Sequence, residues 1–425
     1  MPITHSRLNL EDAVPTASIA PYFPFARVKP VDQVLTTDAG GNVVKSRITL
    51  ASNPRRVPVC SGCLGPTRSV HSTTIRSVRD LPLAGARTEL LVPVRKLRCP
   101  RCCGIRNEHH EFLTPYRRST VRFERAVADL ARVLSLEHVA RHFGLDWDTV
   151  KEIDKRRLTE EVGTPSYDGL RLLAVDEFAV HKGHRYMTTV LDIDTGRIVW
   201  IGRDRTKATL MGFFNELTEE QRSRIEAVAS DMASGYREAV LESCPHAALV
   251  YDLFHVVAKF SREVVDRVRV DESKRERDET GRRLIKGSRY LLLRNEENLT
   301  GDQRERLDAL LEANWKLCTV YILKDQLKQI WRYRSPWWAR RALEEWCELA
   351  ETSGITPLTT FARNLWRHAE GIINHCRYPL HTGRLEGINN KIKVIKRMAY
   401  GFRDDAYFML KIKGAFPGKL QPNPG

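Results

Sequence analysis

Two pairs of closely spaced cysteines constrain the first part of the chain more than any other feature. They are Cys60-Ser-Gly-Cys63 and Cys99-Pro-Arg-Cys102, with 35 residues between them. Each pair offers two thiolates, and four thiolates complete the tetrahedral shell of a structural zinc ion. The pattern therefore predicts a small module in which the β-prone segment between the pairs folds back. We expect one structural zinc ion, because four protein ligands leave no open position for a reacting water molecule.

Other interpretations of these cysteines stay open. Cys103 follows the second pair and is an alternative to Cys102, although Cys102 repeats the spacing of the first pair. His109 and His110 are spare ligand candidates, and ordinary buried thiols are a further alternative. Disulfides are disfavoured, since the cysteine count of nine is odd and the N-terminus lacks the pattern of an export signal. A cytoplasmic location is expected.

The charge of the chain predicts a polyanionic partner. Lys and Arg outnumber Asp and Glu by 69 to 53, which gives a formal net charge of +16 over 425 residues. Nucleic acid is the first partner to consider for such a chain. An anionic membrane surface is the competing partner, but no run of about 18 apolar residues is present. We therefore expect a nucleic-acid-binding protein of two to four domains with no membrane segment.

A helix-turn-helix is expected after the cysteine module. Residues 136–144 predict a short helix that ends at Gly144, and residues 148–158 predict a second helix with Asp148 as its N-cap. A helix, a glycine-containing turn and a basic helix are the layout of a DNA-reading pair. The alternative is that the basic face is only solvated. The expected outward, DNA-binding side chains of the second helix are Lys151, Lys155, Arg156 and Arg157.

Carboxylates follow apolar strands in the middle of the chain. A buried strand is predicted from Leu170 to Asp176, and a second apolar segment runs from Ile225 to Asp231. Glu177 is expected on the opposite face because strand side chains alternate. A hairpin turning at residues 194–196 separates the two segments, and a further strand ends before Asp252. Three antiparallel strands followed by two crossover strands are the order of a ribonuclease-H-like fold.

This strand order predicts which acids meet. The first and fourth strands of such a sheet are neighbours, so Asp176 and Asp231 are expected together, whereas Asp252 lies one strand further out. Oxygen ligands suit Mg²⁺ or Mn²⁺, and two ions about 3.5 to 4 Å apart bracket the reacting oxygens of a phosphodiester. A third carboxylate is expected from the helix at residues 384–397, where Glu386 lies beside an apolar stripe. An ordinary exposed glutamate is the alternative for Glu386.

Several short motifs occur in one order between Cys60 and Phe416. They are Val70-His71-Ser72, Arg79-Asp80-Leu81-Pro82, Arg98-Cys99-Pro100-Arg101-Cys102, Ala174-Val-Asp-Glu177, Ser230-Asp-Met232, Asp252-Leu-Phe-His255, Thr382-Gly-Arg-Leu-Glu386-Gly-Ile-Asn-Asn-Lys391, Lys396-Arg397 and Gly401-Phe402. With these motifs the chain resembles the ISL3 family of bacterial insertion-sequence transposases. Two departures are the extra Cys103 and Leu253, which stands where such proteins often carry a basic residue.

The resemblance implies an enzyme that cuts DNA at the ends of an element and joins the freed 3′-hydroxyl to target DNA. It implies a DDE triad of Asp176, Asp231 and Glu386 that holds two Mg²⁺ or Mn²⁺ ions. Asn390, Lys391 and Lys393 are then expected near the scissile phosphates. Transposon ends and target DNA are the implied partners, and a homo-oligomer on DNA is expected. His255 is a further candidate for the site, although a hydrogen-bonded structural histidine is the favoured interpretation.

The expected organisation is a multi-domain chain with an α/β ribonuclease-H-like core of mixed sheet. An all-helical insertion interrupts this core. Its arginines and lysines, with the tryptophans of residues 331–338, either clamp DNA or pack internally. Two other functions are considered: a DNA-binding regulator with an inactive catalytic fold, and a stand-alone ribonuclease-H-like nuclease. The expected parts are a poorly defined, strand-poor leader (1–55), the zinc-binding module (56–115), the helix-turn-helix (116–165), the first part of the core (166–258), the helical insertion (259–356), the C-terminal core helices (357–416) and a tail (417–425).

Overall fold

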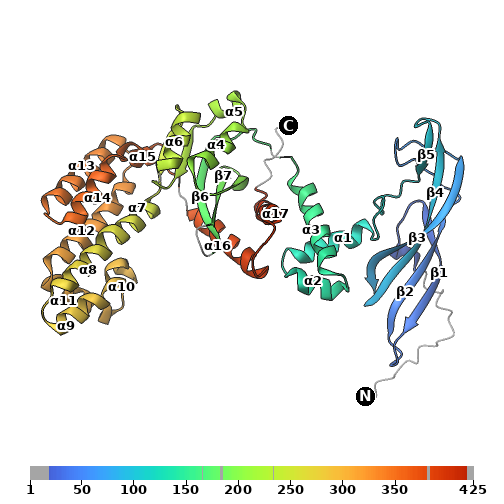
Figure 1. Cartoon of the computed structure of the whole chain (residues 1–425), viewed down its shortest axis with the longest axis horizontal. Coiled ribbons are helices and arrows are strands. Elements are labelled where there is room, and N and C mark those ends of the chain that lie inside the picture. Colours follow the sequence, from blue (N-terminus) through green and yellow to red (C-terminus); the bar gives the residue numbers. More distant parts are fainter. Residues whose placement is uncertain (1–18, 165, 182–184, 233, 381–382, 419–425) are drawn as a thin grey trace, which may run out of the picture. The chain divides into compact units, whose positions relative to one another are not determined.

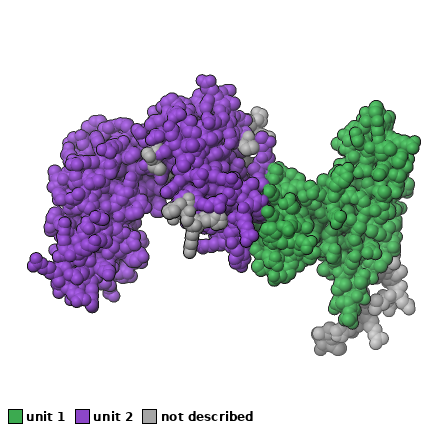
Figure 2. Space-filling view, viewed as in Figure 1, with its two compact units in different colours: residues 1–160 green, residues 161–425 purple. Residues whose placement is uncertain are grey.

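The computed structural model describes residues 19–418 except 165, 182–184, 233 and 381–382, and residues 383–386 by their backbone alone. The chain divides into two compact units, residues 1–160 and residues 161–425, coloured separately in Figure 2. Each unit has its own sheet and its own helices (Figure 1). The units are therefore described one at a time.

A five-stranded sheet forms the first half of unit 1. Its order is β1-β2-β4-β3, and β5 pairs with β4 beyond the end of this path. β2 and β4 are parallel, whereas the β1–β2, β3–β4 and β4–β5 pairs are antiparallel. The strand bounds are β1 (Val28–Thr37), β2 (Val43–Ser52), β3 (Val70–Leu83), β4 (Ala86–Cys99) and β5 (Gly104–Asn107).

The prediction of a strand-poor leader is wrong for residues 28–52, which form β1 and β2. β1 is an edge strand with several exposed apolar side chains, among them the consecutive Val34 and Leu35. It therefore lacks the strict apolar–polar alternation by which a half-buried strand is recognised. In β2 the alternation is present only in its second half, where Ile48 and Leu50 are buried.

Three helices complete unit 1: α1 (Val121–Ala131), α2 (Leu136–Phe143) and α3 (Trp147–Val162). They share a core around Phe123, Val139, Phe143 and Val150. Ser135 caps the start of α2 through its side chain, and Gly144 ends that helix with a φ of 59°, which glycine adopts without strain. The predicted pair of helices is therefore confirmed. α3 begins one residue earlier than expected, so Asp148 lies in its first turn and is not its N-cap.

The sheet of unit 2 has the order β10-β9-β6-β7-β8. β6, β9 and β10 are mutually parallel, whereas β7 and β8 run antiparallel to their neighbours. This confirms the predicted strand order, with the first and fourth strands side by side. The strand bounds are β6 (Leu172–His181), β7 (Arg185–Asp192), β8 (Arg197–Arg203), β9 (Ala227–Ser230) and β10 (Ala248–Tyr251).

β6 does not end at Asp176 as predicted but continues to His181. Its pairing with β9 covers only Leu172 to Ala174, whereas its pairing with β7 extends as far as His181. The hairpin with β7 thus satisfies the backbone groups of β6 beyond the point where β9 ends. Asp176 therefore lies in the middle of β6, two residues beyond Ala174, the last residue of β6 that pairs with β9.

Helices cover both faces of this sheet (Figure 1). On one face α4 (Lys207–Asn215) and α6 (Ser234–Ser243) pack against each other and supply Phe213 and Tyr236 to a core that includes Val175. On the other face Phe178 of β6 contacts Phe408 of α17 (Asp405–Ala415) edge to face, and α16 (Gly383–Met398) lies against β6. The short α5 (Glu219–Ser223) precedes β9.

A block of helices follows β10 in the chain and shares one hydrophobic core with the sheet. The link is tight at α15, where Gly371 packs against the ring of Tyr251, the last residue of β10. The helices are α7 (Leu253–Phe260), continued by a π-helical turn (Ser261–Val265), α8 (Asp266–Arg275), α9 (Glu279–Gly287), α10 (Arg289–Leu293), α11 (Gly301–Ala313), α12 (Trp315–Gln329), α13 (Pro336–Thr352), α14 (Thr356–Trp366) and α15 (Ala369–Ile373).

We expect Gly371→Ala to lower the free energy of unfolding by about 1 to 3 kcal/mol, the usual cost of overpacking a core. A Cβ atom at this position would lie 2.5 Å from Cδ2 of Tyr251, whose ring is fully buried. Denaturant unfolding followed by circular dichroism measures the change. Gly287→Ala in α9 is the matched control, because its Cβ atom would meet no atom within 4 Å. An unchanged stability of Gly371→Ala would contradict the tight packing.

Candidate functional site

Backbone register brings two acidic residues together in unit 2. The last paired residues of β6 and β9 are Ala174 and Ala229. Continuing this register by two residues puts Asp176 opposite Asp231, which directly follows β9. Asp176 is only 7% exposed, and the negative charge of Asp231 acts on it. The two acids that the sequence singled out therefore lie next to each other.

The carboxylates of this cluster are held in an unfavourable environment for negative charge. Burial raises the pKa of Asp176 above its ordinary value, and the neighbouring Asp231 adds to the rise against the opposing effect of His255. Burial also raises the pKa of Glu177 to about 7, and the charges of Asp231 and Asp176 contribute. Arg205 lies 3.7 Å from the Glu177 carboxylate and offsets part of this effect. Such a cluster of oxygen donors suits a hard divalent cation.

Asn389 of α16 completes the surroundings of Asp176. Its Nδ2 donates a hydrogen bond to Oδ2 of Asp176 over 2.6 Å. Its Oδ1 is buried and has no hydrogen-bond partner among the described residues. Asn389 therefore contributes a buried amide oxygen whose nitrogen neighbour is bound to one of the two acids. The sequence analysis did not assign Asn389 a role, although its position three residues after Glu386 on one helix was a usable signal.

Glu386 lies in α16 one turn before Asn389. Residues three apart on a helix share a face, so the backbone of Glu386 belongs to the face that carries Asn389. The side chain of Glu386 lies outside the described residues.

The polar residues that follow in α16 do not all face one way. Lys393 donates from Nζ to Oδ1 of the exposed Asn390 over 3.3 Å. Lys391 donates from Nζ to the carbonyl oxygen of Ala415 over 2.8 Å, and its ammonium lies over the ring of Phe416. Lys391 is therefore engaged with the end of α17, while Asn390 and Lys393 are paired with each other on the surface.

Asp252 and His255 flank the acidic pair from the next strand. Asp252 follows β10 and is 8% exposed, which places it one strand further from β6 than Asp231, as the strand order predicted. His255 in α7 acts electrostatically on both Asp176 and Glu177. Sequence reasoning favoured a purely structural histidine here, whereas the structure puts this ring within electrostatic range of the acids.

Unit 1 contains a separate cluster of four thiols. One ligand atom each from Cys60, Cys63, Cys99 and Cys102 lies within 4.8 Å of the others. The Sγ atoms of Cys60 and Cys102 are 3.8 Å apart, and those of Cys63 and Cys99 are 3.5 Å apart. Sulfurs about 2.3 Å from a tetrahedral zinc ion are separated by about 3.8 Å, so the cluster fits one structural zinc ion.

The backbone around the thiols supports this assignment. Leu64 and Cys103, the residues after each pair, both have positive φ angles, 54° and 48°. The exposed Cys103 turns its Sγ towards the carbonyl oxygen of Pro100 and is not part of the cluster. Gly62 leaves room for the thiols, because a Cβ atom there would lie 3.2 Å from the Sγ of Cys102. The choice of Cys102 over Cys103 agrees with this geometry.

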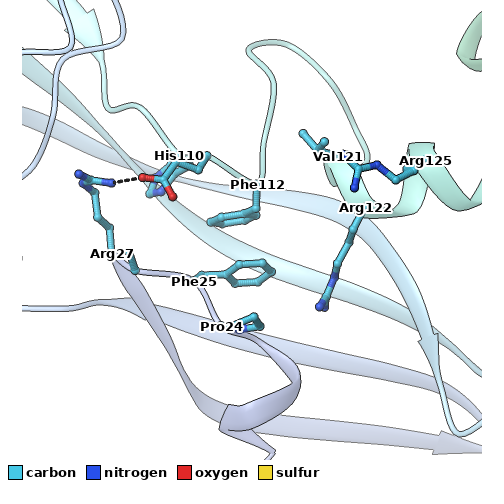
Figure 3. Close-up of a pocket in the computed structure, with 10 residues that line it drawn as sticks. Pro24, Phe25, Arg27, His110, Phe112, Val121, Arg122 and Arg125 are labelled. Carbon is cyan, nitrogen blue, oxygen red and sulfur yellow. Dashed lines mark hydrogen bonds and ion pairs between the residues drawn. The ribbon is translucent and has the colours of Figure 1, made fainter. Parts of the chain in front are cut away.

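His110 lines a pocket in unit 1 and is not one of the four clustered residues. The pocket has a volume of about 260 Å³, and residues before β1 form one of its walls (Figure 3). In that wall Phe25 stacks on Phe112 with ring centroids 3.8 Å apart, and Arg27 forms an ion pair with Glu111. The segment before β1 is thus packed onto the zinc-binding module.

The basic residues of α3 are less exposed than predicted. Arg156 is turned towards α1, where its guanidinium forms an ion pair of 2.7 Å with the carboxylate of Glu124. The prediction that Arg156 points outward is therefore wrong, because a buried glutamate on the neighbouring helix binds it. Lys151, Lys155 and Arg157 are half-buried on the same helix, with Lys151 over the ring of Trp147.

Among the helices that the structure describes, none has the length and apolar character of a membrane-spanning helix.

Family models match the three parts of the chain in order. A zinc-finger model of the IS204/IS1001/IS1096/IS1165 transposases matches residues 56–102, and a helix-turn-helix model of the ISL3 transposase family matches residues 108–158. A transposase model of the DDE type in the ISL3 family matches residues 173–412, more than half of the chain. The models thus cover the thiol cluster, the helix pair and the acidic cluster.

Two curated relatives are insertion-sequence transposases. The transposase for insertion sequence element IS1001 of Bordetella parapertussis is 50% identical over 367 residues, which cover 86% of this chain and 90% of the relative. The transposase for insertion sequence element IS1557 of Mycobacterium tuberculosis is 31% identical over 324 residues, which cover 70% of this chain and 73% of the relative. Both matches extend over most of each chain.

We expect Cys63→Ser to remove the zinc ion and to unfold the module, because three thiolates bind zinc far more weakly than four and metal binding contributes to folding. Inductively coupled plasma mass spectrometry gives the zinc content, and hydrogen exchange of β3 and β4 reports the fold. Cys103→Ser is the matched control and is expected to retain one zinc ion per chain. Full zinc content in Cys63→Ser would remove this residue from the ligand set.

Proposed function

The chain belongs to the ISL3 family of transposases, and we propose that Asp176, Asp231 and Glu386 form its DNA-cutting and DNA-joining centre. The single observation that supports this best is the register of β6 and β9, which brings Asp176 next to Asp231 at a buried edge of the sheet. Glu386 is proposed as the third acid because its helix lies against β6 and carries Asn389, which binds Asp176. The mixed sheet with this strand order is proposed to be a ribonuclease-H-like core.

We propose that two Mg²⁺ ions, or Mn²⁺ ions, bind to these three carboxylates. When bound, such ions activate a water molecule or a 3′-hydroxyl and stabilise charge on the phosphodiester. Asn389 holds the Asp176 carboxylate, which would bind a metal ion, in one orientation through its Nδ2. Asn390 and Lys393 lie on the exposed side of the same helix and are proposed to contact the scissile phosphates.

DNA recognition is proposed to rest on unit 1. The zinc-binding module, held by Cys60, Cys63, Cys99 and Cys102, positions the helix pair, and α3 reads the terminal repeats of the element with Lys151, Lys155 and Arg157. Arg156 is proposed to hold α3 on α1 through Glu124, without contacting DNA. Joining two ends requires two copies of the chain, so a homo-oligomer on DNA is proposed. A cytoplasmic location follows from the same function.

The domain division is proposed with one revision. Residues 28–52 belong to the sheet of the zinc-binding module, so that module begins before residue 56. The helix-turn-helix covers residues 116–165. Residues 166–258 and 357–416 form the catalytic core, and residues 259–356 are a helical insertion that shares its hydrophobic core with the sheet.

We expect Asp176→Asn, Asp231→Asn and Glu386→Gln each to reduce cleavage and strand transfer at least about 1000-fold. Each change keeps the size of the side chain but removes a negative charge that two dications require. A strand-transfer assay with labelled transposon ends measures both steps, and it also separates a transposase from a nuclease or a regulator. Binding of the ends is expected to survive because unit 1 carries it.

Asp252→Asn is the internal control for these three variants. Asp252 follows the outer strand β10, so the variant is expected to keep measurable activity. Thermal melts show whether any loss comes from folding. An inactive Asp252→Asn with a normal melt, together with an active Asp231→Asn, would reassign the second catalytic acid.

We expect Lys151→Ala and Lys155→Ala each to lower the salt dependence of end binding by about one unit of slope, since each lost phosphate contact releases about one counterion fewer. Fluorescence anisotropy of a labelled terminal repeat at several salt concentrations measures the slope. Arg224→Ala is the control for the loss of one positive charge, because Arg224 pairs with Glu220 at the end of α5. Unchanged slopes in both lysine variants would move recognition away from α3.

A further inference from the structure

An exposed aromatic pair stands at the start of α13. Trp337 is 63% exposed and Trp338 is 56% exposed, and their rings meet edge to face with centroids 4.5 Å apart. Single exposed aromatic side chains are common on protein surfaces, whereas these two rings contact each other and expose a joint aromatic surface. The sequence analysis left open whether the tryptophans of this segment clamp DNA or pack internally. Their exposure excludes internal packing for these two residues in the described chain.

The charges beside the pair suit a polyanion. Arg332 and Arg334 precede it by a few residues and are exposed. Neither of them forms an ion pair among the residues that the structure describes, whereas Arg340 on the next turn pairs with Glu370. We call residues 332–338, with these two arginines and two tryptophans, the aromatic–arginine segment. Unpaired guanidinium groups next to free ring faces are the elements with which proteins hold single-stranded nucleic acid.

The segment is anchored at the carboxyl ends of the parallel strands β9 and β10, near Asp231. Trp331 donates from Nε1 to the carbonyl oxygen of Tyr251 over 3.3 Å, and its ring stacks on His375. The carbonyl oxygen of Tyr333 accepts a hydrogen bond of 3.0 Å from Nε2 of His375. Tyr251 ends β10 opposite Ser230, the residue before Asp231. Trp337 is six residues from Trp331, so the Cα atoms of these two residues lie within about 22 Å of each other.

The start of α13 is fixed as well as anchored. Pro336 at the beginning of the helix restricts the backbone there, and Ala339 and Leu343 are buried in the core. The two exposed rings therefore sit on a rigid element, and they gain binding energy without the cost of ordering a loop.

We propose that the aromatic–arginine segment holds unpaired bases of the DNA end beside the catalytic acids, with the tryptophan rings stacking on bases and Arg332 and Arg334 binding the adjoining phosphates. This proposal rests on the proposed function, since it needs the acids at that edge to act on DNA. Stacking does not depend on base identity, so the segment recognises the opened end and not its sequence. A paired duplex keeps its bases stacked inside and offers the rings no free face.

The test compares two DNA probes of arbitrary sequence with the full-length, zinc-loaded protein in the absence of added Mg²⁺ and Mn²⁺, where no cleavage is expected. One probe is a blunt duplex, and the other is a fork with three unpaired nucleotides on each strand that carry 2-aminopurine. We expect the wild type to prefer the fork and to quench 2-aminopurine. The double variant Trp337→Ala/Trp338→Ala is expected to lose at least about fivefold of this preference, because one base stacked on an aromatic ring contributes about 5- to 150-fold in affinity.

Trp315→Ala is the matched control, since Trp315 is 60% exposed on α12 in the same block of helices. It is expected to keep the full preference, and Trp337→Phe/Trp338→Phe is expected to keep part of it. Thermal melts of all variants should agree because the changed rings lie at the surface. A fork preference that persists in the double alanine variant, or an equal loss in Trp315→Ala, overturns the proposal.

A second copy of this chain is the competing occupant of the segment. Sedimentation velocity without DNA decides it: a wild-type dimer that becomes a monomer in the double alanine variant makes the segment a protein interface and overturns the proposal. Asp176→Asn separates this proposal from the assignment of the acids. That variant is expected to keep the fork preference, so a failure of the catalytic assignment would leave the binding result unaffected.

Discussion

The structure of unit 2 is organised around acidic side chains that the backbone forces together. The parallel register of β6 and β9 puts Asp176 next to Asp231, and Glu177 joins them from the opposite face of β6. Burial and mutual repulsion raise the pKa of Asp176 and of Glu177. Folding tolerates this cost only because neighbouring groups compensate for part of it, notably the amide of Asn389 and the guanidinium of Arg205. Divalent cations would relieve the remainder, so the same repulsion that destabilises the metal-free site favours metal binding there.

The helical block is not an appendage of this sheet, because both share one hydrophobic core. The shared core places α15 against β10 with no room for a Cβ atom at Gly371. It also fixes Trp331 at the carbonyl oxygen of Tyr251. Tyr251 pairs with Ser230 of β9, the residue directly before Asp231. A segment held in this way keeps its position relative to the acids without a ligand. For an enzyme that acts on a strand end, this rigidity replaces the ordering cost that a flexible loop would add to DNA binding.

Patterns with a fixed period or spacing were readable from the sequence. The strand order of unit 2, the four clustered thiols and the helix pair follow from apolar runs, from cysteine spacing and from the glycine that ends α2. Features that depend on a partner distant in the chain were not readable. β6 extends to His181 because β7 pairs with it, Arg156 turns inward because Glu124 binds it, and β1 forms although its apolar side chains are exposed. The helix face that Asn389 shares with Glu386 was readable from the sequence, but its hydrogen bond to Asp176, 213 positions away, is seen only in the folded chain.

The two units differ in what stabilises their folds. Unit 1 has a small apolar core, and a thiol cluster supports it in place of a larger apolar interior. Unit 2 needs negative side chains crowded together, and it has a large core that supports them against their repulsion. The same core holds Leu343 of α13, where Ala339 is also buried, so the exposed Arg332 and Arg334 just before this helix are supported by the packing that also supports the acids.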